Sequence, residues 1–187
     1  MTALKLPRTL RVDASDTLVF AQAAEPGEWA VTGSFLFLDA DPARLSPKER
    51  IAFRSGFLGI RSFGFSTLVV VSEASEAERE AAVETLAAQI HERLGAPSLA
   101  LAREAAREEI EAAAALCQPP VNSVLALHRS LDAGGIREQF RLLRPREGAV
   151  PGSDRRHAYA RAFDFAEIDE EPEEQVDLVG LTGSRVP

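Results

Sequence analysis

Seven arginines lie between residues 137 and 161 of this 187-residue chain, against three acidic residues in the same stretch. A guanidinium group binds a carboxylate or a phosphate through paired hydrogen bonds, so arginines that share one face can hold an anion or an acidic peptide. Side chains alternate between the two faces of a β-strand. A strand over residues 136–143 would therefore place Arg137, Gln139 and Arg141 together. This pattern predicts a cationic surface.

The acidic residues gather immediately after the arginines. Segment 164–177 holds eight carboxylates and no basic residue, and residues 164–187 carry a net charge of −7. Opposite charges this close in the chain either pair with each other or bind a partner molecule, and both alternatives stay open. The predicted anion- or partner-binding residues are Arg137, Arg141, Arg144, Arg155 and Arg156, and the predicted apolar docking residues of the tail are Val176, Leu178 and Leu181.

The sequence offers one candidate nucleophilic centre, a cysteine–histidine pair. Cys117 falls in the apolar stripe of a predicted helix, near the C-terminal end, where the helix dipole disfavours a thiolate. His128 lies in the following strand, but a single cysteine in such a stripe is more often a small core residue. A lone cysteine excludes an internal disulfide, and the three histidines lack metal-ligand spacing. We therefore predict no catalytic residue, no metal and no cofactor.

Segment 61–68, Arg-Ser-Phe-Gly-Phe-Ser-Thr-Leu, approaches the first motif of RNA-recognition domains, whose aromatic side chains stack on bases. Ser62, Ser66 and Leu68 depart from that motif, and a net charge of −8 opposes binding to phosphates. The glycines within 56–64 lack the lysine and the following helix of a phosphate loop. We expect a buried phenylalanine-rich strand and no nucleic-acid binding.

Composition indicates a soluble globular domain, with 45% hydrophobic and 27% charged residues. The longest strongly apolar runs, 68–71 and 112–117, are far shorter than the roughly 20 residues that span a bilayer. The N-terminus has no apolar stretch of the length that a signal peptide needs. We expect a cytoplasmic protein that does not enter a membrane.

The first 40 residues are predicted to form strands. Segments 4–12, 17–20 and 29–38 are rich in β-prone residues, and Gly33 is a candidate bulge within the third of them. Their connections are too short for a parallel crossover. An antiparallel meander follows.

Helices are predicted at three places, each starting at a serine that can cap the first turn. Ser46 with Glu49, and Ser75 with Glu78, have the spacing of a capping box. Glycine or proline ends each helix. The predicted helices occupy residues 46–56, 75–95 and 98–119.

A buried strand over residues 65–71 and a hairpin of strands 124–131 and 136–143 complete the predicted elements. Grouped strands with grouped helices indicate an α+β fold, with a mainly antiparallel sheet and helices packed on one face. We expect one domain over residues 1–163 and an acidic tail over 164–187, extended or docked.

Two stretches resemble a known family. Residues 25–31, Glu-Pro-Gly-Glu-Trp-Ala-Val, and the block 56–65 are similar to those of a small proteobacterial family of uncharacterised proteins, and the resemblance runs over most of the first 145 residues. It implies a bacterial cytoplasmic origin. It implies no activity, cofactor or site residue.

These observations lead to two hypotheses of different classes. The preferred one is a non-catalytic accessory or adaptor protein that binds another protein through the arginine-rich sheet face or the acidic tail. The alternative is an enzyme or small-molecule binder that holds an anionic ligand on the same arginines, with Cys117 or His128 nearby. Homo-oligomerisation stays open under both.

Overall fold

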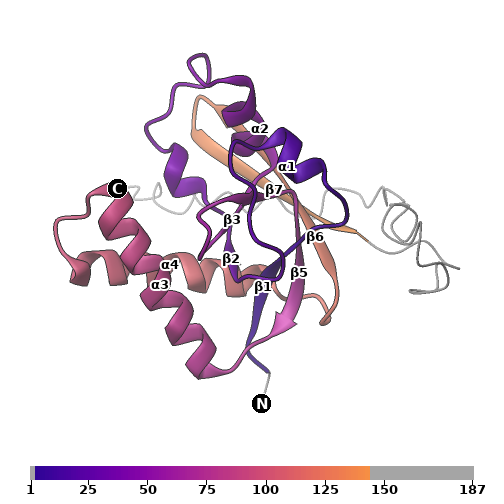
Figure 1. The fold of residues 1–187 in the computed structure, drawn as a ribbon, viewed down its shortest axis with the longest axis vertical. Helices are drawn as coiled ribbons and strands as arrows, with labels where there is room; N and C mark the ends of the chain where they lie inside the picture. The colour runs from indigo at the N-terminus through magenta and orange to yellow at the C-terminus, as the bar shows by residue number, and fades with distance from the viewer. Residues whose placement is uncertain (1–2, 144–187) are drawn as a thin grey trace, which may run out of the picture.

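The computed structural model describes residues 3–143 (Figure 1). The predicted acidic tail, the domain boundary at residue 163 and six predicted site residues lie outside them: Arg144, Arg155, Arg156, Val176, Leu178 and Leu181. Along the chain the elements are β1 (Lys5–Leu10), α1 (Ser15–Val19), β2 (Ala30–Val31), the 3₁₀ helix η1 (Ser34–Phe37), α2 (Pro47–Ser55), β3 (Phe57–Gly59), β4 (Phe65–Ser66), β5 (Leu68–Glu73), α3 (Glu76–Leu94), α4 (Leu99–Leu116), β6 (Val124–Asp132) and β7 (Gly135–Leu143).

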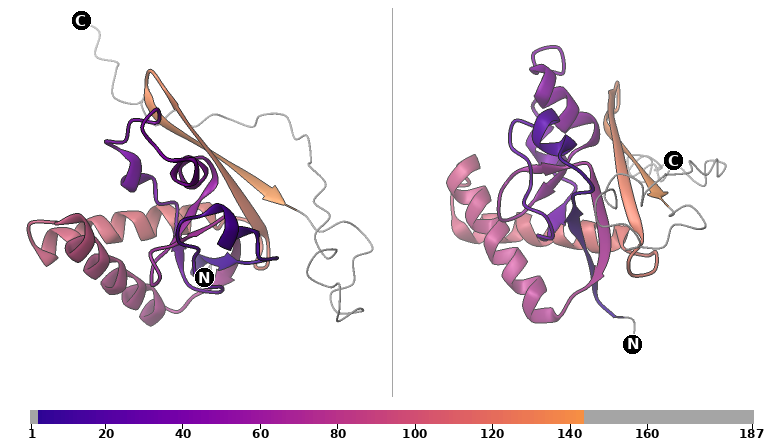
Figure 2. Two further views of the ribbon diagram at one scale, coloured as in Figure 1. Left: turned by 45° about the horizontal axis from the view of Figure 1, so that its top comes forward. Right: turned by 45° about the vertical axis from the view of Figure 1, so that its right-hand side comes forward.

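The strands among the described residues form two antiparallel sheets. The larger has the order β1-β5-β6-β7, and the smaller has the order β2-β3-β4. Helices α3 and α4 pack against each other on one side of the domain, and the β6–β7 hairpin, which forms one edge of the larger sheet, lies on the opposite side (Figure 2). The predicted α+β class is confirmed. No helix among residues 3–143 is long and apolar enough to cross a membrane.

The three predicted helices begin at their predicted capping serines. Both capping boxes are present, at Ser46 and Ser75, and Ser98 accepts the first-turn hydrogen bond of α4. Helix α3 ends at Gly95, whose φ of 70° is a left-handed conformation that glycine adopts without strain. Local sequence therefore determines these helices.

The core forms between this helical pair and the sheets. Helix α4 presents a mostly alanine face, which lets α3 and the neighbouring strands approach closely. A second cluster lies on the inner face of the larger sheet, formed by Val69, Val71, Leu125, Leu127 and Cys117 with Ala30 and Phe57. In this packing, the odd-numbered residues of β5 and β6 point into the core.

The strand predicted over residues 17–20 is wrong, because the chain forms helix α1 there. Asp16 and Phe20 are four residues apart and both are buried, which is the spacing of one helical face. Asp16 accepts hydrogen bonds from the backbone N–H and the hydroxyl of Thr67, and Phe20 packs near Phe65. Tertiary contacts override a weak β propensity.

The strand predicted over residues 29–38 is also wrong in its second half. Strand β2 covers only Ala30–Val31, and Gly33 then turns the chain with a φ of 82°, so it ends the strand instead of bulging it. The following 3₁₀ helix places Phe37 against Phe53 and Phe65. The single strand predicted over residues 65–71 is likewise divided into β4 and β5, which belong to different sheets.

Candidate functional site: the cationic face of the β6–β7 hairpin

The predicted alternation of strand β7 is confirmed in the structure. Arg137, Gln139 and Arg141 are exposed, and the register pairs Gln139 with His128 of β6, which is exposed as well. We call these four residues the cationic face. It lies on the side of the hairpin opposite the inner cluster, because Leu125 and Leu127 point to the other side.

An ion pair holds one end of the cationic face. The Nη2 atom of Arg137 lies 2.8 Å from Oδ2 of Asp132, near the hairpin turn. Both side chains are about half exposed, and exposed pairs of this kind contribute only about 0.2–1 kcal/mol. Arg137 can therefore exchange Asp132 for another carboxylate at little cost.

The acidic residue of strand β7 points away from the cationic face. Glu138 lies on the inner side of the hairpin with Ile136, Phe140 and Leu142, as the alternation predicts. There its Oε1 lies 3.2 Å from Nε of Arg129, and the hydroxyl of Ser34 donates to the same oxygen. This arrangement removes a negative charge from the outer face and leaves the arginines dominant there.

Arg129 is buried beneath the hairpin, and the sequence did not predict its role. Its side chain is 0% exposed, and its guanidinium donates to the carbonyl oxygens of Phe53 at 2.6 Å and Thr32 at 2.7 Å. Its Nε also donates to Ser34 Oγ at 2.9 Å. Burial lowers the pKa of Arg129, while Glu138 opposes that shift.

These bonds fasten β6 and β7 to the end of α2 and to η1, so the cationic face has a rigid support. The only sequence signal for this role is that Arg129 continues the inward series begun by Leu125 and Leu127. A charged residue at an inward position of an alternating strand needs a buried partner. The partner itself cannot be read from the pattern.

Glu109 of α4 interacts electrostatically with Glu138 and Arg129. Burial raises the pKa of Glu109 to about 7, with Glu138 and Glu108 adding to the shift and Arg129 opposing it. In the unfolded chain the same carboxyl loses its proton at an ordinary glutamate pKa of about 4.3. The folded state thus binds more protons between about pH 4.3 and 7, and its stability falls as pH rises through that window.

We expect Glu109→Gln to stabilise the protein at pH 8 by about 1–2 kcal/mol, a value reduced for partial exposure, and to change stability little at pH 4. Glu104→Gln, at another exposed glutamate of the same helix, is the matched control and should change stability equally at the two pH values. Urea unfolding at both pH values measures the effect. Equal gains for Glu109→Gln at pH 4 and pH 8 would contradict this account.

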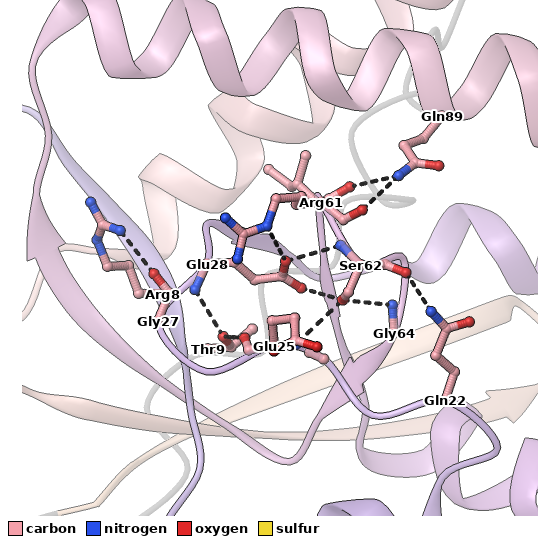
Figure 3. Close-up of polar contacts among 12 residues, drawn as sticks. Arg8, Thr9, Gln22, Glu25, Gly27, Glu28, Arg61, Ser62, Gly64 and Gln89 are labelled. Atoms are coloured by element: carbon pink, nitrogen blue, oxygen red, sulfur yellow. Dashed lines mark hydrogen bonds and ion pairs between the residues drawn. The ribbon is translucent and has the colours of Figure 1, made fainter.

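A second buried carboxylate joins the turn before β2 to the loop after β3 (Figure 3). The side chain of Glu28 is 3% exposed and accepts from the backbone N–H of Ser62 at 2.9 Å and from the Ser62 hydroxyl. Nε of Arg61 lies 3.8 Å away. Gly59 makes room for this carboxylate, because a Cβ there would overlap Oε1 of Glu28. Every oxygen of Glu28 is thus bonded, which favours a structural role.

The two stretches that carry the family resemblance, 25–31 and 56–65, therefore contact each other through Glu28. A model of a family of unknown function, DUF6505, matches residues 3–154. The chain belongs to the DUF6505 family. No curated protein and no solved structure matches it.

The DUF6505 match covers all of the described residues and so includes the whole cationic face. It ends at residue 154, before Arg155 and Arg156 and before the acidic segment 164–177. The expectation of an uncharacterised family is confirmed. The family assigns no chemistry to the cationic face.

In this DUF6505 protein, Cys117 and His128 are on opposite sides of the sheet. Cys117 packs in the inner cluster and is 1% exposed, and burial raises its thiol pKa to about 11. His128 is exposed on the outer face. A thiol in this environment is not activated as a nucleophile. The two residues are not brought together as a catalytic pair.

The phenylalanines of segment 61–68 pack inside the DUF6505 domain. Phe65 contacts Phe20 and Phe37, and Phe63 lies under the guanidinium of Arg93 with 5.1 Å between that group and the ring centroid. Neither ring forms an open platform for a base. Among residues 3–143, no group of histidine, cysteine, aspartate and glutamate side chains is placed to hold a metal.

Proposed function

We propose that this DUF6505 protein is a non-catalytic accessory protein that binds an acidic segment of another protein on its cationic face. The observation that carries the proposal is the sorting of charge across strand β7. Arg137 and Arg141 are exposed on the outer side, while Glu138 is bonded to buried Arg129 on the inner side.

Physical properties of the surface support this function. Arginine is enriched among the residues that dominate binding energy at protein interfaces, because its planar group makes two hydrogen bonds to one carboxylate. The support given by Arg129 means that little ordering is needed on binding.

A hollow of about 290 Å³ lies elsewhere, lined by residues 11–14 and Thr17, and contains no residue of the cationic face. Exposed arginines four residues apart along one strand suit an extended acidic peptide, which can present a carboxylate to each of them.

The experiment compares the full-length chain with the double variant Arg137→Glu, Arg141→Glu. Proteins that co-purify with the wild type at stoichiometric amounts are identified, purified and titrated against both forms. We expect the double variant to weaken the dissociation constant by at least about 10-fold, since two desolvated arginines at an interface together contribute more than 1.4 kcal/mol.

The matched control is Arg44→Glu, Arg50→Glu, which reverses two exposed arginines outside the cationic face. It has the same net charge as the test variant and should bind as the wild type does. Equal loss in both variants would mean that only net charge matters and would overturn the assignment of the face. Recovery of a bound small anion in place of a protein, lost in the test variant alone, would favour a small-molecule function.

The cytoplasmic location, the bacterial origin and the docking role of the tail remain predictions of the sequence. The tail residues lie outside the described residues, so the cationic face alone carries this proposal.

A further inference from the structure

Strand β7 is the last strand of the larger sheet. Among residues 3–143 it pairs with β6 on one side only (Figure 2). Its nine residues give an edge about 30 Å long. An edge strand presents a row of backbone N–H and C=O groups that can pair with another extended chain. Within the described part of the chain, the cationic face thus borders a sheet edge that can add a strand.

The inner contacts of the hairpin hold this edge in place. Glu138 is bonded to Arg129, and the ring centroid of Phe140 lies 6.4 Å from that of Phe57. A strand held from its inner side keeps its geometry when another strand is added, so the added chain alone loses conformational freedom.

The spacing of the arginines sets the charges of a fitting partner. Arg137 and Arg141 are four residues apart on one face, which is about 13 Å along a strand. Side chains directly opposite each other on paired strands interact, and opposite charges stabilise the pair by about 0.2–1 kcal/mol. A complementary strand therefore carries two carboxylates four positions apart on the same face.

A second β7 strand offers the two arginines no carboxylate in any register, because Glu138, the one acidic residue among residues 135–143, lies on the other face. Antiparallel pairing of two β7 strands centred on Gln139 would place Arg137 opposite Arg141 of the other copy, and centring on Glu138 would place two glutamates opposite each other. Like charges in these positions destabilise a sheet. Charge complementarity instead favours an acidic segment, and under the proposed function this segment belongs to a different protein.

We propose that the partner binds by strand addition to the open edge of β7, as an extended segment with acidic side chains at positions i and i+4 facing Arg137 and Arg141. This inference rests on the proposed function and deepens it, because it states how the partner binds. Backbone hydrogen bonds supply the affinity and the two arginines select the register.

The test uses full-length protein and a synthetic peptide with blocked ends. The peptide alternates threonine and valine over twelve residues, with glutamate replacing two threonines four positions apart. Two further peptides carry N-methyl groups on alternate amides, one on the even and one on the odd positions. In an added strand, only one alternating set of N–H groups faces the edge.

We expect the unmodified peptide to bind, one N-methylated peptide to lose at least about 10-fold in affinity, and the other to bind nearly as well as the unmodified one. Amide resonances of residues 136–142 should shift on binding. Arg137→Glu, Arg141→Glu should weaken binding, and a peptide with lysines in place of the two glutamates should fail to bind wild type.

The outcomes separate this inference from the proposed function. Charge-dependent binding that both N-methylated peptides retain would overturn strand addition and leave the cationic face as the docking site. Failure of every peptide to bind would overturn strand addition, while the co-purified partner would still test the function by itself. A concentration-dependent dimer in sedimentation, lost when the arginines are reversed, would assign the edge to a second copy and overturn the inference.

Discussion

Replacement of Arg129 by methionine should lower the free energy of unfolding by about 3–5 kcal/mol, the range for breaking a buried ion pair on one side. Methionine fills much of the same volume but donates no hydrogen bond. The carbonyl oxygens of Phe53 and Thr32 would lose donors at 2.6 and 2.7 Å, and Glu138 would lose its charged partner. Since small domains are stable by only about 5–15 kcal/mol, this single change removes a large share of the total.

The measurement is urea unfolding followed by circular dichroism and by the fluorescence of Trp29, the only tryptophan. Arg137→Met is the control, because it removes an arginine of the same hairpin that lies on the outer face, and it should cost less than about 1 kcal/mol. If Arg129→Met does not fold, Arg129→Lys keeps the charge but not the forked geometry and should lie between the two. Similar stability of Arg129→Met and Arg137→Met would refute the central role of Arg129.

Replacement of Gly59 by alanine is expected to have the second large effect, a loss of about 2–4 kcal/mol. The added methyl group would overlap Oε1 of Glu28, and this carboxylate cannot move aside without breaking its bonds to Ser62. A buried carboxylate without partners is costly. The loop after β3 should then separate from the turn before β2.

Gly134→Ala is the matched control, because the nearest atom to its added methyl group is Oδ1 of Asp132 at 3.3 Å, in an exposed turn. It should change stability by less than about 1 kcal/mol. The double variant Gly59→Ala, Glu28→Ala tests the cause, since removal of the carboxylate relieves the overlap. If the overlap is the cause, the double variant should be less destabilised than the sum of the two single losses. Additive losses would contradict a direct clash.

Gly59→Ala should leave binding on the cationic face unchanged as long as the domain folds, because Gly59 lies outside the β6–β7 hairpin. Arg129 does touch the hairpin, so Arg129→Lys is the more informative of its variants for binding. An unchanged affinity in Arg129→Lys would show that the face tolerates small shifts of its support. A weaker affinity with normal folding would show that the support positions Arg137 and Arg141.

Much of the fold could be predicted because the signals are local. A serine and a glutamate three residues apart close a capping box within one turn, and both predicted boxes, at Ser46 and Ser75, are present. The β6–β7 hairpin and its alternation follow equally from neighbouring residues, since a two-residue connection joins Asp132 to Gly135. The exposure of Arg137, Gln139 and Arg141 follows from the same alternation.

The N-terminal third was predicted less well because distant residues decide it. Segment 17–20 has β-prone residues, but helix α1 forms there because Asp16 finds its partner in Thr67, 51 residues away. Gly33 ends strand β2 where close packing against Leu58 leaves no room for a side chain. A pattern of residue types carries no information about such contacts.

Alone, the sequence determined where α2, α3 and α4 begin and end, which strands form a hairpin, and which arginines share its outer side. Each of these depends on residues a few positions apart. Only the tertiary structure decided that Glu138 is withdrawn to buried Arg129, that Arg129 is bonded to Thr32 at a separation of 97 residues, and that Cys117 and His128 lie on opposite sides of the sheet. The physical reason is that burial and hydrogen-bond satisfaction depend on what packs together in three dimensions, and a buried charge is stable only where distant carbonyl groups converge on it.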